Sequence, residues 1–247
     1  MSKPEFIIPE WPAPAHVRAA VTTRTGGVSE GDYAGLNLAM HVGDDSQAVT
    51  HNRQLVVDQL NLPAEPVWLN QVHGTDVIAV EGPAEPVDAD AAITNKSNVV
   101  CVVLTADCLP VLFTDSEGRC VAAVHAGWRG LCNGVLENTV AAFNTQGIVA
   151  ENILTWLGPA IGPEAYEVDE PVRNAFLNVP PDTSQAFSES RPEHWYLDLN
   201  AAARIRLSAV GVTRVFGGGF CSFSDERFYS HRRAAPCGRM ASAIWLG

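Results

Sequence analysis

Short apolar runs alternate with polar or glycine-containing segments along most of the chain. Runs of this length, bounded by turn residues, are typical of buried strands. A turn at Ser116–Gly118 separates two of them and predicts a hairpin. Strands are predicted at residues 16–24, 66–74, 75–80, 98–108, 110–115, 119–127, 152–162 and 243–247.

Helical spacing of apolar residues appears in fewer places. Asp45 or Ser46 is placed to cap a helix that runs through about Leu60. A longer helix is predicted over residues 128–147, with Gly147 as its stop. Shorter helices are predicted near 170–178 and 199–210, and loops at 82–95 and 178–195.

Strands and helices mix without a strict strand–helix–strand rhythm, which favours an α/β (α+β) fold with mixed sheets. No segment has the composition of a linker between two domains. We therefore expect residues 1–247 to form a single domain. The sequence does not indicate the oligomeric state.

Composition narrows the classes of partner and compartment. The formal net charge of −12 argues against binding to nucleic acid or to an anionic membrane, because such partners select basic surfaces. No run reaches the roughly 18 apolar residues of a membrane span, and the first residues lack the apolar core of a secretory signal. Six cysteines in a chain of this length are not a disulfide framework. These features predict a soluble cytoplasmic protein.

Three residues with metal-binding side chains end or nearly end predicted strands: His73, Cys108 and His125. Strand ends gather at the rim of a sheet, where binding sites form. One thiolate and two imidazoles suit a transition metal, and three protein ligands leave a fourth tetrahedral position open, as in catalytic zinc sites. The spacing alone also allows incidental buried residues, or a metal-free pair of Cys108 as nucleophile and His125 as base.

At these residues the chain resembles a known family. The segments "QVHG", "TADCLPVLF" and "HAGWRGL", with "TRTGGVS", "LNLAMHVGD", "WLGPAIGP" and "FYSHRR" in the same order, are similar to the YfiH/laccase-domain family. Its members are variously named polyphenol oxidase, purine nucleoside phosphorylase and peptidoglycan editing factor. The resemblance implies a layered α/β sandwich, with His73, Cys108 and His125 as ligands of Zn²⁺ and copper as the alternative metal.

The family names point to different reactions. A multicopper oxidase needs a further histidine-rich cluster, but the chain has seven histidines and no His-x-His pair. We therefore favour a zinc-dependent purine nucleoside phosphorylase, acting on a nucleoside and phosphate, with adenosine deaminase and methylthioadenosine phosphorylase activity besides. The first alternative is a cytoplasmic amidase that edits peptidoglycan precursors, and the second a copper-dependent polyphenol oxidase. A non-enzymatic protein with a structural metal is a third class.

Further residues near these motifs are candidates for the site. Arg24 and Arg129, beside glycine turns, are predicted to bind phosphate or substrate, although either can serve in a surface ion pair. Asp107 is predicted to act as a general base or to orient a ligand, with a turn cap as the alternative. Gln71, which shares a strand face with His73, is predicted to assist at the substrate. Asn37 is assigned to substrate binding because the resemblance includes it.

Other motifs and residues carry less weight. Ser29 lies in a G-x-S-x-G match, but no helix is predicted after it, so we interpret it as a loop residue. Trp128 is interpreted as a core residue rather than a stacking platform for a base. Gly219, Phe220 and His231 depart from what relatives are expected to carry, and these departures affect the choice of substrate rather than the three metal ligands.

Overall fold

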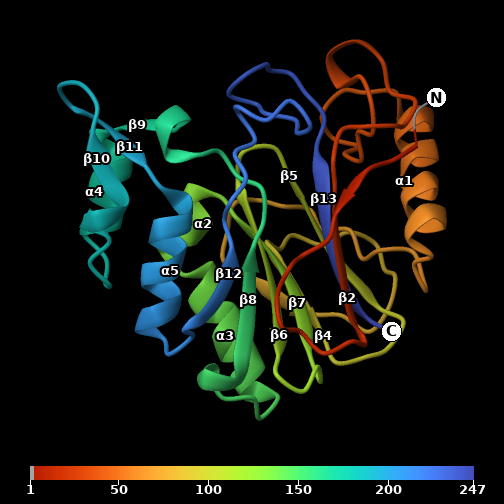
Figure 1. Ribbon diagram of the computed structural model, residues 1–247, viewed down its shortest axis with the longest axis horizontal. Coiled ribbons are helices and arrows are strands. Elements are labelled where there is room, and N and C mark those ends of the chain that lie inside the picture. Colours follow the sequence, from red (N-terminus) through yellow and green to blue (C-terminus); the bar gives the residue numbers. More distant parts are fainter. Residues whose placement is uncertain (1–2) are drawn as a thin grey trace.

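The computed structural model describes residues 3–247. Two β-sheets stack against each other, and helices cover both outer faces (Figure 1). Helix α1 (Ser46–Leu60) lies on one side; α2 (Trp128–Asn133), α3 (Val135–Thr145) and α5 (Leu199–Ala209) lie on the other. The predicted layered α/β sandwich with mixed sheets is confirmed.

The two stacked sheets differ in strand direction. The first is antiparallel and has the order β1 (Phe6–Ile7), β2 (Val17–Thr22), β13 (Met240–Leu246), β5 (Val100–Thr105). The second is mixed and has the order β12 (Arg214–Gly217), β8 (Ile153–Leu157), β6 (Leu109–Asp115), β7 (Val121–Ala126), β4 (Ala91–Thr94), β3 (Val77–Ala79).

A small third sheet lies to one side with α4 (Glu170–Leu177), in the upper left of Figure 1. Its order is β10 (Phe187–Glu189), β11 (His194–Leu197), β9 (Glu167–Asp169). Single 3₁₀ turns occur at Gly31–Tyr33, Ala150–Asn152, Pro163–Ala165 and Ser184–Ala186.

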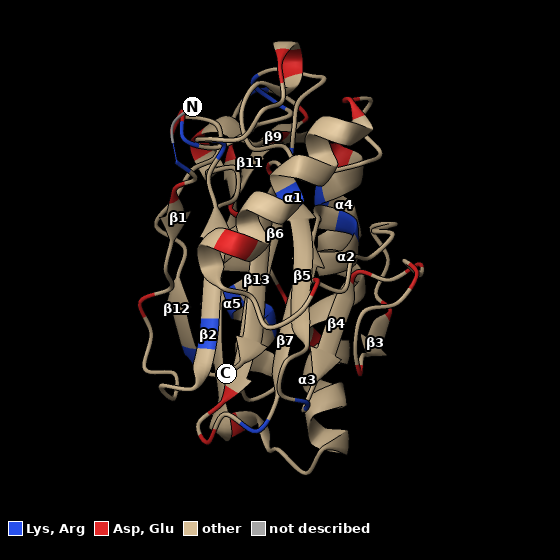
Figure 2. Cartoon of the chain, turned by 90° about the vertical axis from the view of Figure 1, so that its right-hand side faces the viewer, with Lys and Arg blue, Asp and Glu red and all other residues tan. Residues whose placement is uncertain are grey.

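Strand β5 is buried on both faces, which explains its unbroken apolar sequence. Cys101 and Val103 pack between the two sheets, in the same cluster as Leu112 of β6. Val102 and Leu104 point the other way, into the cluster beneath α1. Figure 2 shows α1 lying across this outer face of the four-stranded sheet.

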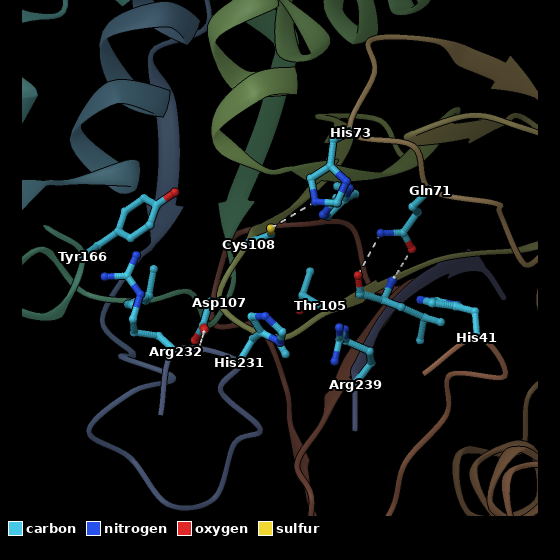
Figure 3. A pocket seen from close by; sticks show the side chains of 14 residues that line it. His41, Gln71, His73, Thr105, Asp107, Cys108, Tyr166, His231, Arg232 and Arg239 are labelled. Atoms are coloured by element: carbon cyan, nitrogen blue, oxygen red, sulfur yellow. Dashed lines mark hydrogen bonds between the residues drawn. The ribbon is translucent and has the colours of Figure 1, made fainter. Parts of the chain in front are cut away.

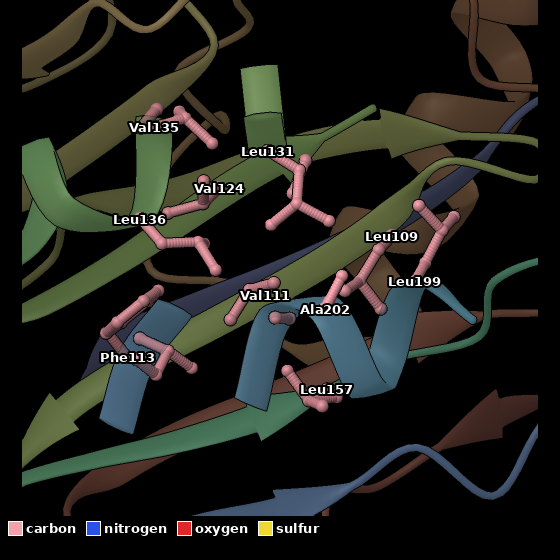
Figure 4. Close-up of a cluster of buried hydrophobic side chains, with 14 of the residues drawn as sticks. Leu109, Val111, Phe113, Val124, Leu131, Val135, Leu136, Leu157, Leu199 and Ala202 are labelled. Carbon is pink, nitrogen blue, oxygen red and sulfur yellow. The ribbon is translucent and has the colours of Figure 1, made fainter. Parts of the chain in front are cut away.

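The six-stranded sheet buries its outer face against α2, α3 and α5 (Figure 4). Val111 and Phe113 of β6 contact this cluster together with Leu136 of α3 and Ala202 of α5. All four residues are fully buried. Because both faces of β6 and β7 are covered, the hairpin predicted for residues 110–127 is a rigid support at the centre of the molecule.

Helix α1 matches its prediction. The side chain of Asp45 accepts a hydrogen bond from the backbone N–H of Gln47, so Asp45 rather than Ser46 is the cap. Val49 and Val56, which lie on one face of the helix, are buried. The helices near 170–178 and 199–210 and the C-terminal strand are also present, as α4, α5 and β13.

The single helix predicted over residues 128–147 is wrong. Gly134 has φ 104° and separates α2 from α3, because a left-handed residue ends the first helix and turns the chain into the second. The backbone N–H of Gly134 caps α2 on Gly130 O.

Three strand and loop predictions are also wrong. Residues 66–74 form no regular strand: Val67 and Asn70 each make one isolated bridge, to Cys101 and Asp88. The predicted loop at 82–95 ends in β4, which pairs with β7, and the loop at 178–195 contains β10 and the start of β11. For β4, pairing with a strand distant in sequence decided the conformation, and the local sequence does not indicate such pairing.

Within residues 3–247, no helix is both long and apolar enough to cross a bilayer.

Candidate metal centre

The structure brings His73, Cys108 and His125 together. Each offers one donor atom, and these atoms all lie within 4.8 Å of one another. The Sγ of Cys108 is 3.9 Å from Nε2 of His73, and the two imidazole rings stand nearly perpendicular with centroids 4.7 Å apart. Sulfur and nitrogen ligands of a tetrahedral zinc lie roughly 3.5 Å apart. The donor types and their spacing therefore fit zinc, and they fit copper by type.

The three residues reach this point from different kinds of backbone. His125 is the penultimate residue of β7, as predicted. Cys108 lies in the three-residue connection from β5 to β6. His73 follows the irregular segment that replaces the predicted strand, so its expected position at a strand end is wrong.

Two left-handed residues shape the backbone around the cluster. His73 has φ 59° and Asp107 has φ 89°, a region that residues with side chains rarely adopt. Such conformations persist only when the surroundings hold them, and they are common at functional sites. Here they turn the chain so that the imidazole of His73 and the thiol of Cys108 approach the same point.

Gly127 permits this close approach. A Cβ atom at Gly127 would lie 2.8 Å from Cδ2 of His73 and 3.2 Å from Sγ of Cys108. The first distance is too short for a side chain to fit without moving the ring of His73, and the second requires the thiol of Cys108 to shift slightly. The glycine in "HAGWRG" is therefore required by packing against the metal-binding side chains.

A fully buried carboxylate, Asp90, holds two of the three residues. Asp90 Oδ1 accepts a hydrogen bond from Nδ1 of His125 at 2.7 Å and from the backbone N–H of His73 at 3.0 Å. Asp90 Oδ2 accepts from the N–H of Gly74 at 2.5 Å. With Nδ1 donating to a carboxylate, Nε2 of His125 is the nitrogen left to bind a ligand. The sequence interpretation missed Asp90 because it lay in a predicted loop.

The thiol and the imidazole change each other's ionisation. Burial raises the pKa of Cys108, but the charge of His125 and hydrogen bonds from both histidines outweigh it, and the pKa falls to about 6. Burial lowers the pKa of His125, but Cys108 and Asp90 outweigh it, and the pKa rises to about 9. Cys108 is therefore a thiolate near neutral pH, which is the form that binds metals.

The cluster opens into a cavity of about 330 Å³, a size typical of small-molecule sites (Figure 3). Exposed His41, His73, His231 and Arg232 lie at its mouth. The lining residues are His41, Gln71, His73, Leu104, Thr105, Ala106, Asp107, Cys108, His125, Ile161, Tyr166, His231, Arg232 and Arg239.

Gln71 lines the cavity, but both ends of its amide already have partners. Its Nε2 donates to the carbonyl of Leu104 at 2.8 Å, and its Oε1 accepts from the N–H of Leu104 at 2.7 Å (Figure 3). This pair of bonds ties the irregular segment before His73 to the end of β5. The contacts define Gln71 as a support for the cavity wall.

Asp107 also lines the cavity, and its carboxylate holds another segment in place. Oδ1 accepts from Ser222 Oγ at 2.6 Å, and Oδ2 accepts from the backbone N–H of Arg232 at 2.7 Å. The segment that carries His231 and Arg232 is thereby fixed next to Cys108 (Figure 3).

Arg24, Asn37 and Arg129 are not among the residues that line the cavity. Arg24 donates to Ala34 O and lies over the ring of Tyr229. Asn37 is fully buried and bonds to the backbone of Ala39 and the side chain of Asp44.

Two of the other residues singled out in the sequence have structural contacts. Arg129 lies over Trp128, which packs against the core. Ser29 donates to Asp44 from a loop.

Several lining residues were not predicted: His41, Thr105, Tyr166, Arg232 and Arg239. His41 and Arg232 lie in the quoted segments "LNLAMHVGD" and "FYSHRR". Arg232 was one of the arginines available for phosphate, but Arg24 and Arg129 were favoured over it. Three residues differ from those expected in relatives. Of these, His231 lines the cavity, whereas Gly219 and Phe220 do not.

Comparison with known proteins agrees with this fold. A family model described as "Multi-copper polyphenol oxidoreductase laccase" matches residues 18–247. The relative "Purine nucleoside phosphorylase YfiH" of Escherichia coli is 50% identical over 248 residues and covers the whole of both chains. "Purine nucleoside phosphorylase PA4543" of Pseudomonas aeruginosa is 50% identical over 243 residues, 98% of each chain.

Solved structures match as closely. Protein NMB0706 of Neisseria meningitidis superposes with a TM-score of 0.91 at 45% identity, covering 98% of each chain. YlmD of Geobacillus stearothermophilus has a TM-score of 0.89 at 33% identity and covers 94% of this chain and 92% of that one.

Fold and site thus define a layered α/β protein with a His–Cys–His cluster at one end of its sheets. The chain belongs to the YfiH-like family described as multi-copper polyphenol oxidoreductase laccase, as the resemblance of its motifs implied.

Proposed function

We propose that the chain is a zinc-dependent purine nucleoside phosphorylase that acts as one domain in the cytoplasm. The observation that carries the proposal is the His73–Cys108–His125 cluster opening into a nucleoside-sized cavity that also holds arginine side chains. Relatives named purine nucleoside phosphorylase at 50% identity over nearly the full chain support it. The six free cysteines suit a reducing compartment.

His73, Cys108 and His125 are the residues that would hold the metal, with Asp90 orienting His125. When bound, zinc supplies a Lewis acid beside the substrate. Within residues 3–247 no second group of three such donors lies close enough to bind another ion. Copper oxidase chemistry that reduces oxygen needs more copper sites than one, which weighs against the oxidase alternative.

The reaction is a group transfer without redox change. The bond between C1′ of the ribose and N9 of the purine breaks, and a bond forms between C1′ and a phosphate oxygen. The electron pair leaves with the purine, and the proton of hydrogen phosphate ends on the purine. Arginine side chains of the cavity would bind the phosphate and stabilise its charge as it is transferred.

Adenosine deamination and methylthioadenosine phosphorolysis are part of the proposal, because both act on the same nucleoside scaffold. The amidase alternative requires room for a muropeptide. The cavity volume of about 330 Å³ lies at the lower end for ligand sites, which favours the smaller nucleoside.

The test is turnover by protein with a measured metal content. Zinc-loaded protein is incubated with phosphate and adenosine, inosine or methylthioadenosine, and the products are separated by chromatography. We expect free purine and the ribose 1-phosphate, with loss of activity in Cys108→Ser. His51→Ala, on the exposed side of α1, is the matched control. No turnover of any nucleoside, with release of an amino acid from a serine-containing muropeptide precursor, would replace the proposal with the amidase.

A further inference from the structure

The cavity has two sides that differ in charge. In the view of Figure 3, Tyr166 and Arg232 lie on one side, His41 and Arg239 lie on the other, and Thr105 lies between them. The first side contains a carboxylate, Asp107, whereas no acidic residue lines the second.

Arg239 is held by Asn37 and by two neighbouring backbone carbonyls, and its guanidinium keeps free donors. Its backbone N–H donates to Asn37 Oδ1 at 2.9 Å, and its Nη1 donates to the carbonyls of Cys237 at 2.7 Å and Gly238 at 3.1 Å. Within residues 3–247, its Nε and Nη2 have no hydrogen-bond partner and its guanidinium has no carboxylate within ion-pair distance. Asn37 therefore acts on the cavity indirectly, by holding Arg239.

His41, on the same side of the cavity, has a lowered pKa. Burial lowers its pKa first, and the positive charges of Arg239 and Arg53 lower it further. Arg53 itself lies over the ring of Trp68, 3.6 Å from the centroid, and donates to Leu38 O. Arg53 does not line the cavity and lies near the carboxylate of Glu65, so Arg239 is the group on this side that can attract an anion, with no acidic residue lining the cavity beside it.

Thr105 lines the same space, and its hydroxyl oxygen is buried in the cavity wall. It is 2% exposed, it lines the cavity, and its Oγ1 has no hydrogen-bond partner in the part of the chain that the structure describes. Thr105 lies on the same side of β5 as Val103, which faces the six-stranded sheet. A buried hydroxyl without a partner is costly, so a ligand oxygen at this position would satisfy it.

Arg232 on the other side differs from Arg239 in having a carboxylate beside it. Its Nη1 donates to the carbonyls of Ala165 at 3.4 Å and Glu167 at 3.2 Å, and its guanidinium lies over the ring of Tyr166. Its backbone N–H bonds to the carboxylate of Asp107, which also offsets the charge nearby. An oxyanion there would lie close to the carboxylate of Asp107, whereas no lining residue beside Arg239 is acidic.

We infer that Arg239, His41 and Thr105 form an oxyanion subsite and that it takes the phosphate co-substrate, in place of the predicted Arg24 and Arg129. The inference rests on the proposed phosphorylase function. It puts phosphate in the same cavity as the metal cluster but on the side away from Tyr166 and Arg232.

Binding of inorganic phosphate is measured first without any nucleoside, by the broadening of its ³¹P NMR signal. Arg239→Gln is expected to weaken binding about tenfold or more, because a hydrogen bond to a charged group is lost. Thr105→Val is expected to weaken binding about threefold, with recovery in Thr105→Ser. His41→Gln tests the exposed member of the subsite, and Arg18→Gln on the surface of β2 is the matched control.

Kinetics give the second readout. In Arg239→Gln and Thr105→Val, the KM for phosphate should rise by the same factors while the KM for the nucleoside stays within about twofold. Unchanged phosphate binding in Arg239→Gln, with weakened binding in Arg24→Gln or Arg129→Gln, would overturn the subsite. So would binding of adenosine 5′-phosphate that depends on Arg239 when inorganic phosphate does not bind.

The subsite and the function can fail separately. If phosphate binding depends on Arg239 but no nucleoside is cleaved, the subsite stands and the phosphorylase function fails. Nucleosides could be cleaved while substitution of Arg239, His41 and Thr105 changes neither phosphate binding nor the KM for phosphate. In that case the function stands and the subsite fails.

Discussion

Asp90 and His125 form a buried pair in which the carboxylate accepts the Nδ1 hydrogen at 2.7 Å. The same carboxylate accepts the backbone N–H groups of His73 and Gly74. One side chain therefore sets the ring orientation of one donor residue and the backbone turn of another. Although Asp90 is not one of the three donor residues, its removal should weaken metal binding.

Asp90→Asn should lower the affinity for zinc about 10- to 100-fold, because the amide no longer favours the Nδ1–H form of His125. Competition with a chromophoric chelator measures this affinity. Asp76→Asn, an exposed carboxylate nearby, is the control. Equal affinity in Asp90→Asn and the unaltered protein would show that the pair does not tune the site.

Purified protein should contain one zinc ion per chain, measured by elemental analysis. Dialysis against a strong chelator should remove both the metal and the phosphorolysis, and added zinc should restore both. Cys108→Ser should hold less than a tenth of the metal, roughly, because thiolate is the strongest of the three donors. Cys221→Ser, which keeps all three donors, should retain it. Full metal content in Cys108→Ser would exclude Cys108 as a ligand.

Gly127→Ala should weaken metal binding although it removes no donor. The added methyl group would lie 2.8 Å from Cδ2 of His73 and 3.2 Å from Sγ of Cys108, so one of them must move. Gly219→Ala is the matched control, since a Cβ there meets no atom within 4 Å. Equal zinc affinities of the two variants would contradict the close packing.

Cys108 and Cys221 are the two partly exposed cysteines, and the other four are buried. Burial raises the pKa of Cys221, but hydrogen bonds from Ser224 and neighbouring backbone groups outweigh it, and the net pKa is lowered. Its thiolate fraction should therefore reach its plateau at a lower pH than that of an ordinary thiol. Burial raises the pKa of Cys120 to about 12, so this thiol stays protonated and slow to react at neutral pH.

Alkylation followed by peptide mass spectrometry measures these rates. Zinc-loaded protein should be modified at Cys221 alone, and metal-free protein at Cys108 as well. Modification of Cys120 at a comparable rate in folded protein would contradict the packing described.

Leu112→Ala should lower the free energy of unfolding by about 2–5 kcal/mol, because Leu112 is fully buried between the sheets and its loss leaves a cavity. Val149→Ala, at a residue 55% exposed, should change stability by less than about 0.5 kcal/mol. Denaturant unfolding followed by circular dichroism compares the two. A small effect in Leu112→Ala would mean that the two sheets do not share a tight core.

The central strands and the capped helix could be predicted because their signals are local. The apolar runs of β5, β6 and β7 reflect burial on both faces, and Asp45 bonds within its own helix turn. Recognition of the three metal-binding residues came from motifs around them. Their meeting at one point depends on the fold, which spacing along the chain does not encode.

Asp90 could not be predicted for the same reason. It reaches His125 because Ala91 pairs with Val124 when β4 joins β7, and β4 was hidden in a predicted loop. The free donors of Arg239 and the unpartnered hydroxyl of Thr105 likewise appear only once distant segments are in place. Arg24 and Arg129 were chosen for their closeness to motifs in sequence, but their side chains pack on aromatic rings outside the cavity.

Cys108 lies in the connection by which the chain leaves one sheet and enters the other, since β5 belongs to the four-stranded sheet and β6 to the six-stranded one. His125 lies on the second of these sheets, and Gln71 anchors the approach to His73 on the first. An ion held by these side chains would link the two stacked sheets to each other. Loss of the ion would weaken the connection between the two sheets at the cavity, so the melting temperature of the protein should increase with its metal content.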